Sequence, residues 1–152
     1  MSELKKLSIQ FLKVSIVLIL IPVIVLGLYG LIWLPGNPVS PRYAHMIYPV
    51  LVGFYLASVP VLYAGSRLYV LLTHMSKDTL TPAVKVKILS KLKKAAAAAG
   101  AVFILIMPFV FLIADEDDAP GLIIVSGIPV LFTMIAFAVI TLFEYSASRE
   151  KN

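Results

Sequence analysis

The sequence predicts an all-α fold, an integral membrane bundle of four helices whose N and C termini both lie in the cytoplasm. The 152-residue chain is 61% hydrophobic and only 14% charged, whereas soluble chains are roughly 45–50% apolar and 25% charged. A soluble domain of this size cannot bury so much apolar surface. Four stretches are long and apolar enough to cross a bilayer, and the basic residues gather in alternate connections between them.

The four spans are expected at residues 14–34, 47–72, 95–114 and 122–143, within a single transmembrane domain covering residues 1–152. About 20 apolar residues are enough, because a helix rises about 1.5 Å per residue and the hydrocarbon core is about 30 Å thick. Arg67 carries the one charge within these spans. The runs do not alternate apolar with polar residues, as barrel strands would. The first run is too long for a signal-peptide core and no A-x-A-like site follows it, so it is interpreted as an uncleaved span.

The basic residues indicate the orientation of the chain. All but Arg42 fall on one side of the predicted membrane, and short basic connections stay in the cytoplasm. These residues are Lys5, Lys6, Lys13, Arg67, Lys77, Lys85, Lys87, Lys91, Lys93, Lys94, Arg149 and Lys151. The acidic run at residues 115–118 is then expected outside. Tyr29, Trp33, Tyr43 and Tyr48 cluster at the same outer boundary, as an aromatic belt would.

Residues 76–94 form an amphipathic cytoplasmic segment before the third span. Thr81 followed by Pro82 is a good N-cap and first-turn pair. The helix that they begin has apolar side chains on one side and lysines on the other. Two interpretations stay open: an interfacial helix lying on anionic lipid, or a straight extension of the third span. In either case the expected contacts for lipid or a partner are Lys77, Lys85, Lys87, Lys91, Lys93 and Lys94.

Each span contains a proline: Pro22, Pro60, Pro108 and Pro129. A proline removes one backbone hydrogen bond and tends to kink a helix. Kinked helices can open a ligand cavity, as in transporters with broken helices. Proline is also simply frequent in membrane helices, which is the favoured interpretation.

Small residues predict where helices approach one another closely. Gly53, Ala57, Pro60 and Ala64 recur on one face of the second span, and the run at residues 95–100 offers a similar surface on the third. Such faces let neighbouring backbones pack tightly in membranes. We interpret them as packing surfaces and not as sites.

Arg67 is the most informative single residue. It lies near the cytoplasmic end of its span, so its side chain can extend to the interface without a partner. Glu144 lies at a comparable depth in the fourth span. A structural ion pair between Arg67 and Glu144 is therefore one hypothesis, and unpaired snorkelling of Arg67 is the other.

The sequence favours no catalytic, cofactor-binding or metal-binding residue. Four adjacent carboxylates at residues 115–118 point in different directions, whereas hard cations need converging oxygens. His45 and His74 are expected on opposite sides of the membrane. Nucleotide-binding, hydrolase and zinc-protease motifs are absent from the sequence. We expect a protein that is not an enzyme and has no cofactor. Despite the net charge of +5, the placement of the charges favours a membrane surface over direct binding of nucleic acid.

The chain resembles the YoaS-like family of small bacterial membrane proteins (domain of unknown function 2975), and the resemblance covers nearly its whole length. The matching motifs are F-L-K with a following I-P-V at residues 11–23, W-L-P at 33–35, Y-P-V-L-V-G at 48–53 with Pro60, the lysine-led segment at 77–86, M-P-F at 107–109 and D-D-A-P-G at 117–121. The alanine run at residues 95–99 departs from the pattern, where bulkier residues are expected.

The resemblance implies four membrane helices and a bacterial plasma-membrane location, with no assigned activity. Members are often encoded beside a small helix-turn-helix regulator, so the leading hypothesis is a membrane partner of such a regulator, contacted through residues 76–94. The alternatives are a small transporter or channel-like protein, with a cavity lined by Tyr55, Ser58, Ser66 and Tyr69, or a peptide-immunity protein. Homo-oligomerisation is left open.

Overall fold

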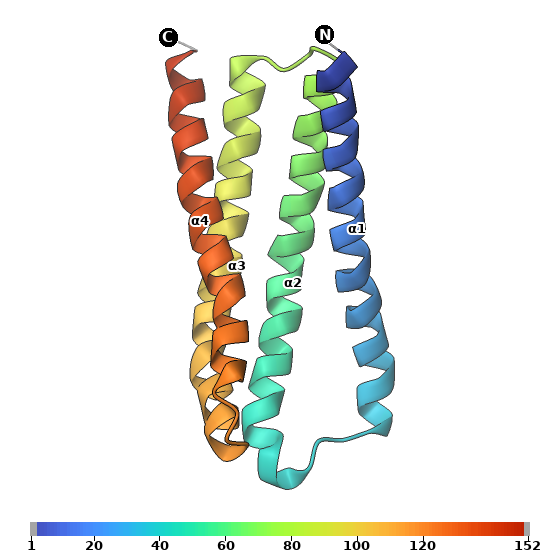
Figure 1. Ribbon diagram of the computed structural model, residues 1–152, viewed down its shortest axis with the longest axis vertical. Coiled ribbons are helices and arrows are strands. Elements are labelled where there is room, and N and C mark those ends of the chain that lie inside the picture. The colour runs from blue at the N-terminus through green and yellow to red at the C-terminus, as the bar shows by residue number, and fades with distance from the viewer. Residues whose placement is uncertain (1–2, 151–152) are drawn as a thin grey trace.

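The computed structural model describes residues 3–150, which form four α-helices and one short 3-10 helix (Figure 1). The elements are α1 (Glu3–Trp33), η1 (Leu34–Gly36), α2 (Pro41–Ser76), α3 (Pro82–Glu116) and α4 (Gly121–Arg149). All four α-helices are long and apolar enough to cross a membrane. Each predicted span falls on its own helix, the first running one residue into η1. Within residues 3–150, the all-α fold with four helices able to span a membrane is confirmed.

The helices run up and down, so that both ends of the described chain lie at the same end of the molecule (Figure 1). This basic end comprises the start of α1, the end of α2, the start of α3 and the end of α4. The opposite, acidic end carries the run at residues 115–118. Helices of 29 to 36 residues measure about 44–54 Å, against a hydrocarbon core of about 30 Å. The helices therefore extend beyond the hydrocarbon core. Of the basic residues predicted for the cytoplasmic side, Lys151 lies outside the described residues.

The helices do not surround one closed core. Within residues 3–150, α3 packs extensively against both α2 and α4, whereas α1 packs against α2 alone and far more sparsely. Contacts that hold α1 include a hydrogen bond and a cation–π contact: the hydroxyl of Tyr55 donates to the carbonyl of Gly27 at 2.9 Å, and Lys13 lies 5.3 Å from the centre of the Tyr69 ring. The four-helix bundle expected from the sequence is thus uneven, with a core of three helices and α1 at its edge. The sequence did not show this, because hydropathy indicates spans but not their neighbours.

Small residues make the close packing of α3 possible, as predicted. Gly53 of α2 is buried, and a Cβ added there would overlap the side chain of Ile106 on α3. Ala57 is 1% exposed on the same face of α2. On the other side of α3, Gly100 is buried, with the Thr133 hydroxyl of α4 placed 3.0 Å from where its Cβ would be. The small residues let the backbones approach closely.

In the amphipathic segment, Ser76 ends α2 and residues 77–81 form the turn between α2 and α3, whereas the part from Pro82 onward belongs to α3, which runs unbroken from Pro82 to Glu116. Thr81 caps it as predicted, its hydroxyl accepting from the amide of Val84 at 3.4 Å. Ile88, Leu89 and Leu92 are buried against α2 and α4, in a cluster with Ala147 and the partly buried Ala64, Val70, Leu71, Val84, Val86 and Ile140. The interfacial-helix interpretation is therefore wrong, because the apolar face of this segment covers protein and not lipid.

Two tight turns end α2 and α3 in the same way. Asp78 and Asp118 adopt positive φ angles of 52° and 49°. The amide of Thr79 bonds to the carbonyl of His74 at 3.1 Å, and that of Ala119 to Ala114 at 2.8 Å. These are the bonds of the Schellman motif, usually built around glycine. The short turns keep α2, α3 and α4 adjacent and antiparallel.

The helices continue through the prolines of the four spans, Pro22, Pro60, Pro108 and Pro129. Pro49 is a second proline inside α2. The helix begins at Pro41, six residues before the predicted span. Bending at these prolines stays a prediction.

Candidate functional site

Two ion pairs join α3 to α4 at the basic end. Lys93 pairs with Glu144, and both side chains are mostly buried, with 29% and 19% of their surfaces exposed. Nearer the end of the helices, Lys85 donates to Glu150 at 3.3 Å. The predicted partner of Glu144 was Arg67, and the structure places Lys93 there instead. That prediction fails because α4 packs against α3 and not against α2.

The remaining lysines of the segment form no ion pair within residues 3–150. Lys77, Lys87 and Lys94 are exposed, whereas Lys91 is partly buried. Lys91 and Lys94 lie on the side of α3 that faces α2, where they line a groove. The six predicted lysines thus divide into two that bind α4, two that project freely and two that line the groove. Sequence periodicity alone did not separate them, because the side of α3 that meets α4 was unknown.

The groove between α2 and α3 has a volume of about 580 Å³ and apolar walls. Its lining residues are Leu56, Val59, Pro60, Tyr63, Lys91, Lys94, Ala95, Ala98 and Val102. Pro60 is the only one of the four predicted proline positions that lines it. The two lysines stand at the end of the groove nearest the basic end, because α3 runs from Lys91 toward Val102 into the predicted span.

Arg67 adds a third cation beside this groove. Its guanidinium carbon lies 4.9 Å from the centre of the Tyr63 ring, and Tyr63 lines the groove. The Nε of Arg67 is buried without a hydrogen-bond partner among the described residues. A buried charged donor without an acceptor is costly, and the contact with the Tyr63 ring is a favourable interaction of its guanidinium.

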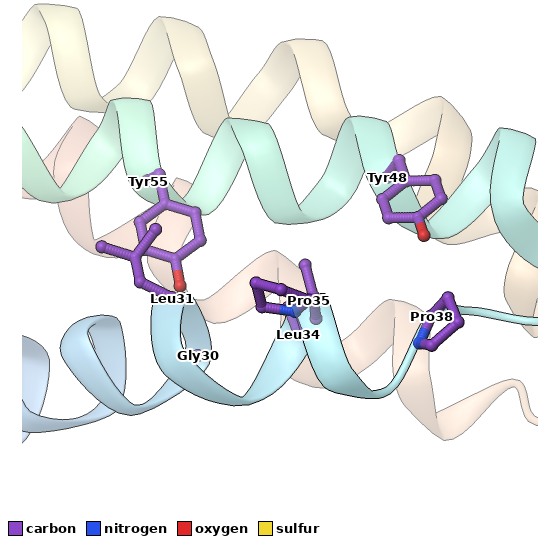
Figure 2. Close-up of a pocket in the computed structure, with 7 residues that line it drawn as sticks. All are labelled: Gly30, Leu31, Leu34, Pro35, Pro38, Tyr48 and Tyr55. Atoms are coloured by element: carbon purple, nitrogen blue, oxygen red, sulfur yellow. The ribbon is translucent and has the colours of Figure 1, made fainter.

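A second hollow, of about 350 Å³, opens between α1 and α2 toward the acidic end. Figure 2 shows Tyr55 and Tyr48 extending from α2 toward α1 and the loop that follows η1. Both hydroxyls are engaged: Tyr55 donates to Gly27, and the hydroxyl of Tyr48 accepts from the amide of Val39 at 3.4 Å. The two tyrosines therefore link α2 to α1 and to the loop that follows η1, and the hollow offers few free polar groups.

Of the four residues suggested for a transporter cavity, Tyr55 lines the hollow between α1 and α2, and none lines the groove between α2 and α3. Ser58 and Ser66 donate to carbonyls of their own helix, those of Tyr55 and Tyr63, at 2.6 and 2.7 Å. Tyr69 faces Lys13 on α1. Local bonds of this kind satisfy a hydroxyl in lipid without creating a polar path.

At the acidic end, Arg42 and Glu116 form an exposed ion pair at 2.8 Å that links the start of α2 to the end of α3. From the sequence, Arg42 was noted only as the one basic residue on the outer side of the predicted membrane. Its position on the same side as the acidic run at residues 115–118 was the signal that could have predicted this ion pair. Within residues 3–150, no cluster of three or more His, Asp and Glu side chains is arranged to hold a metal ion.

The long apolar helices and the charged ends define a multi-pass α-helical membrane protein. The chain belongs to a protein family of unknown function, DUF2975, whose model matches residues 36–144. It is also similar to the uncharacterized membrane protein YoaS of Bacillus subtilis (strain 168), with 29% identity over 139 residues that cover 90% of this chain and 86% of the relative. No solved structure gives a significant match. The family predicted from the sequence is confirmed.

Proposed function

We propose that this is a non-enzymatic protein of the bacterial plasma membrane whose basic end faces the cytoplasm and binds an acidic surface of a helix-turn-helix regulator. The observation that carries the proposal is the pair of exposed lysines, Lys77 and Lys87, that the protein itself leaves unneutralised. Their side chains carry a positive charge beyond the predicted end of the membrane span. Positive charge of this kind attracts an acidic protein surface.

The start of α3 is suited to hold such a surface rigidly. Lys87 lies about 12 Å before the start of the predicted span at residue 95, at about 1.5 Å per residue. Ile88, Leu89 and Leu92 fix this part of α3 against α2 and α4. Lys87 therefore projects from a packed helix, which reduces the ordering that binding requires, while Lys77 lies at the C-cap of α2, in the short turn before α3.

The test is co-purification of the full-length protein with a small helix-turn-helix regulator of the kind that the family resemblance associates with such proteins. Lys77→Gln with Lys87→Gln should reduce recovery of the regulator about tenfold or more, since each rim charge chiefly speeds association and strengthens long-range attraction. The wild-type complex should also weaken with rising salt. Lys91→Gln with Lys94→Gln removes the same charge from the groove and should leave recovery unchanged. Equal recovery with both double variants and wild type would refute the proposal.

A further inference from the structure

We propose that the groove between α2 and α3 is a binding site for one acyl chain of an anionic phospholipid, whose phosphate is held by Lys91 and Lys94. This inference concerns a lipid and does not depend on the regulator. It rests on the shape of the groove, on the cations at one end of it and on their depth in the membrane.

The apolar part of the groove lies within one leaflet. Along α3 it runs from Ala95 to Val102, which at about 1.5 Å per residue is about 10 Å. Half of a hydrocarbon core of about 30 Å is about 15 Å. An acyl chain lying along Ala95, Ala98 and Val102 would therefore follow the groove through about two thirds of the leaflet, from the headgroup level toward the midplane.

The depth of the lysines matches the headgroup region. Lys94 immediately precedes the predicted span, and Lys91 lies one turn nearer the basic end. Lys87 and Lys77 lie farther from the hydrocarbon. Lys93 lies at the same level but is paired with Glu144, so Lys91 and Lys94 are the lysines of α3 that are left for a phospholipid phosphate while its acyl chain occupies the groove.

The charge at this end of the groove is not compensated by the protein. Glu144, the acidic residue of α4 at a similar depth, is bound by Lys93 on another side of α3. Lys91 and Lys94 form no ion pair within residues 3–150, and Arg67 has a buried Nε without a partner beside the groove wall. An anionic phosphate provides several acceptor oxygens for such donors. A zwitterionic headgroup carries its own cation, so the anionic phospholipid is favoured.

The first test addresses the headgroup. Protein purified in mild detergent is incubated with equal amounts of phosphatidylglycerol and phosphatidylethanolamine, and the bound lipid is identified by native mass spectrometry. Wild type should retain phosphatidylglycerol in excess, and Lys91→Gln with Lys94→Gln should reduce that excess about tenfold, consistent with the attraction of each lysine for anionic lipid. Lys77→Gln with Lys87→Gln, which removes the same net charge, should retain it. Equal losses in the two double variants would overturn the proposal in favour of diffuse attraction by the whole basic end.

The second test addresses the acyl chain. Ala98 is exposed and lines the groove, whereas its neighbour Ala97 is exposed and does not. Ala98→Phe should fill the groove and lower phosphatidylglycerol retention at least several-fold, while Ala97→Phe should leave it unchanged. Thermal unfolding of both variants without added lipid verifies that they fold alike. Undiminished retention by a folded Ala98→Phe variant would show that the chain lies elsewhere and would overturn the assignment.

Discussion

Glu144 is the acidic residue on which the basic end depends most. Its carboxylate is mostly buried and binds Lys93, so that α3 and α4 are joined by a charge pair as well as by apolar packing. Removing one partner would leave the other as a half-buried charge without compensation. The pair therefore fixes how α3 and α4 are aligned, and with them the direction in which the other lysines point.

We predict that Glu144→Gln lowers the free energy of unfolding by about 1.5–3 kcal/mol, the range for a hydrogen bond to a charged group. The double variant Lys93→Glu with Glu144→Lys should recover most of that loss. Thermal unfolding in detergent measures both. The exposed Lys6–Glu3 pair on α1 is the control, and Glu3→Gln should cost no more than about 0.5 kcal/mol. If the charge swap is as unstable as the single variant, the pair is not what joins the helices.

Gly53 shows how closely α2 and α3 approach. Gly53→Ala should lower thermal stability, with a cost of about 1–3 kcal/mol, because its Cβ would collide with the buried Ile106. Gly127 lies inside α4 with nothing within 4 Å of the corresponding position. Gly127→Ala should be neutral or stabilising, since alanine favours helix by up to about 1 kcal/mol. A Gly53→Ala variant as stable as Gly127→Ala would contradict the close packing.

The residue-level predictions from the sequence succeeded where they depended on a single helix. The Thr81 cap and the small face around Gly53 follow from local pattern and were found. The partner of Glu144 was predicted wrongly, as Arg67 instead of Lys93. The two cations lie at similar depths, and only knowledge of which helices are neighbours distinguishes them. Hydropathy gives depth along the membrane normal but not the angular position of one helix around another.

Among the elements, α3 determines the architecture. It contacts α2 and α4 along its length, and its first turns complete a core cluster beyond the predicted span. The amphipathic pattern of residues 76–94 is equally compatible with lipid and with protein as the apolar partner. The ends of α2 and α4 also extend past the predicted membrane. Their side chains cover the apolar face of α3, which is therefore not available to lipid.

We predict that the junction between α3 and α4 tolerates no added volume at Ala147, which is 0% exposed. Ala147→Leu should lower the free energy of unfolding by about 1–3 kcal/mol, as overpacking of a core does. Ala138→Leu, on an exposed position of the same helix, should change it little. Thermal unfolding of the two variants makes the comparison, and equal stability would show that the segment from Pro82 is not packed as described.

At the scale of the whole molecule, α1 differs from the other helices. It is nearly uncovered by protein, with Ile9 its one buried residue among those described. In water such a helix would be unstable, whereas in a bilayer lipid covers its apolar surface. The number of helices could be predicted from hydropathy for this reason. The peripheral position of α1 could not, because the run of α4, which packs extensively against α3, has a mean hydropathy of 2.6, close to the 2.8 of α1.

The central claim is that the chain crosses the membrane four times with its basic end in the cytoplasm and its acidic end outside. The chain contains no cysteine, so single cysteines can be introduced at Lys87 and at Asp117 without background. In intact cells, a membrane-impermeant maleimide should label Asp117→Cys, and it should label Lys87→Cys only after the membrane is permeabilised. Labelling of both positions in intact cells, or of neither, would contradict the account.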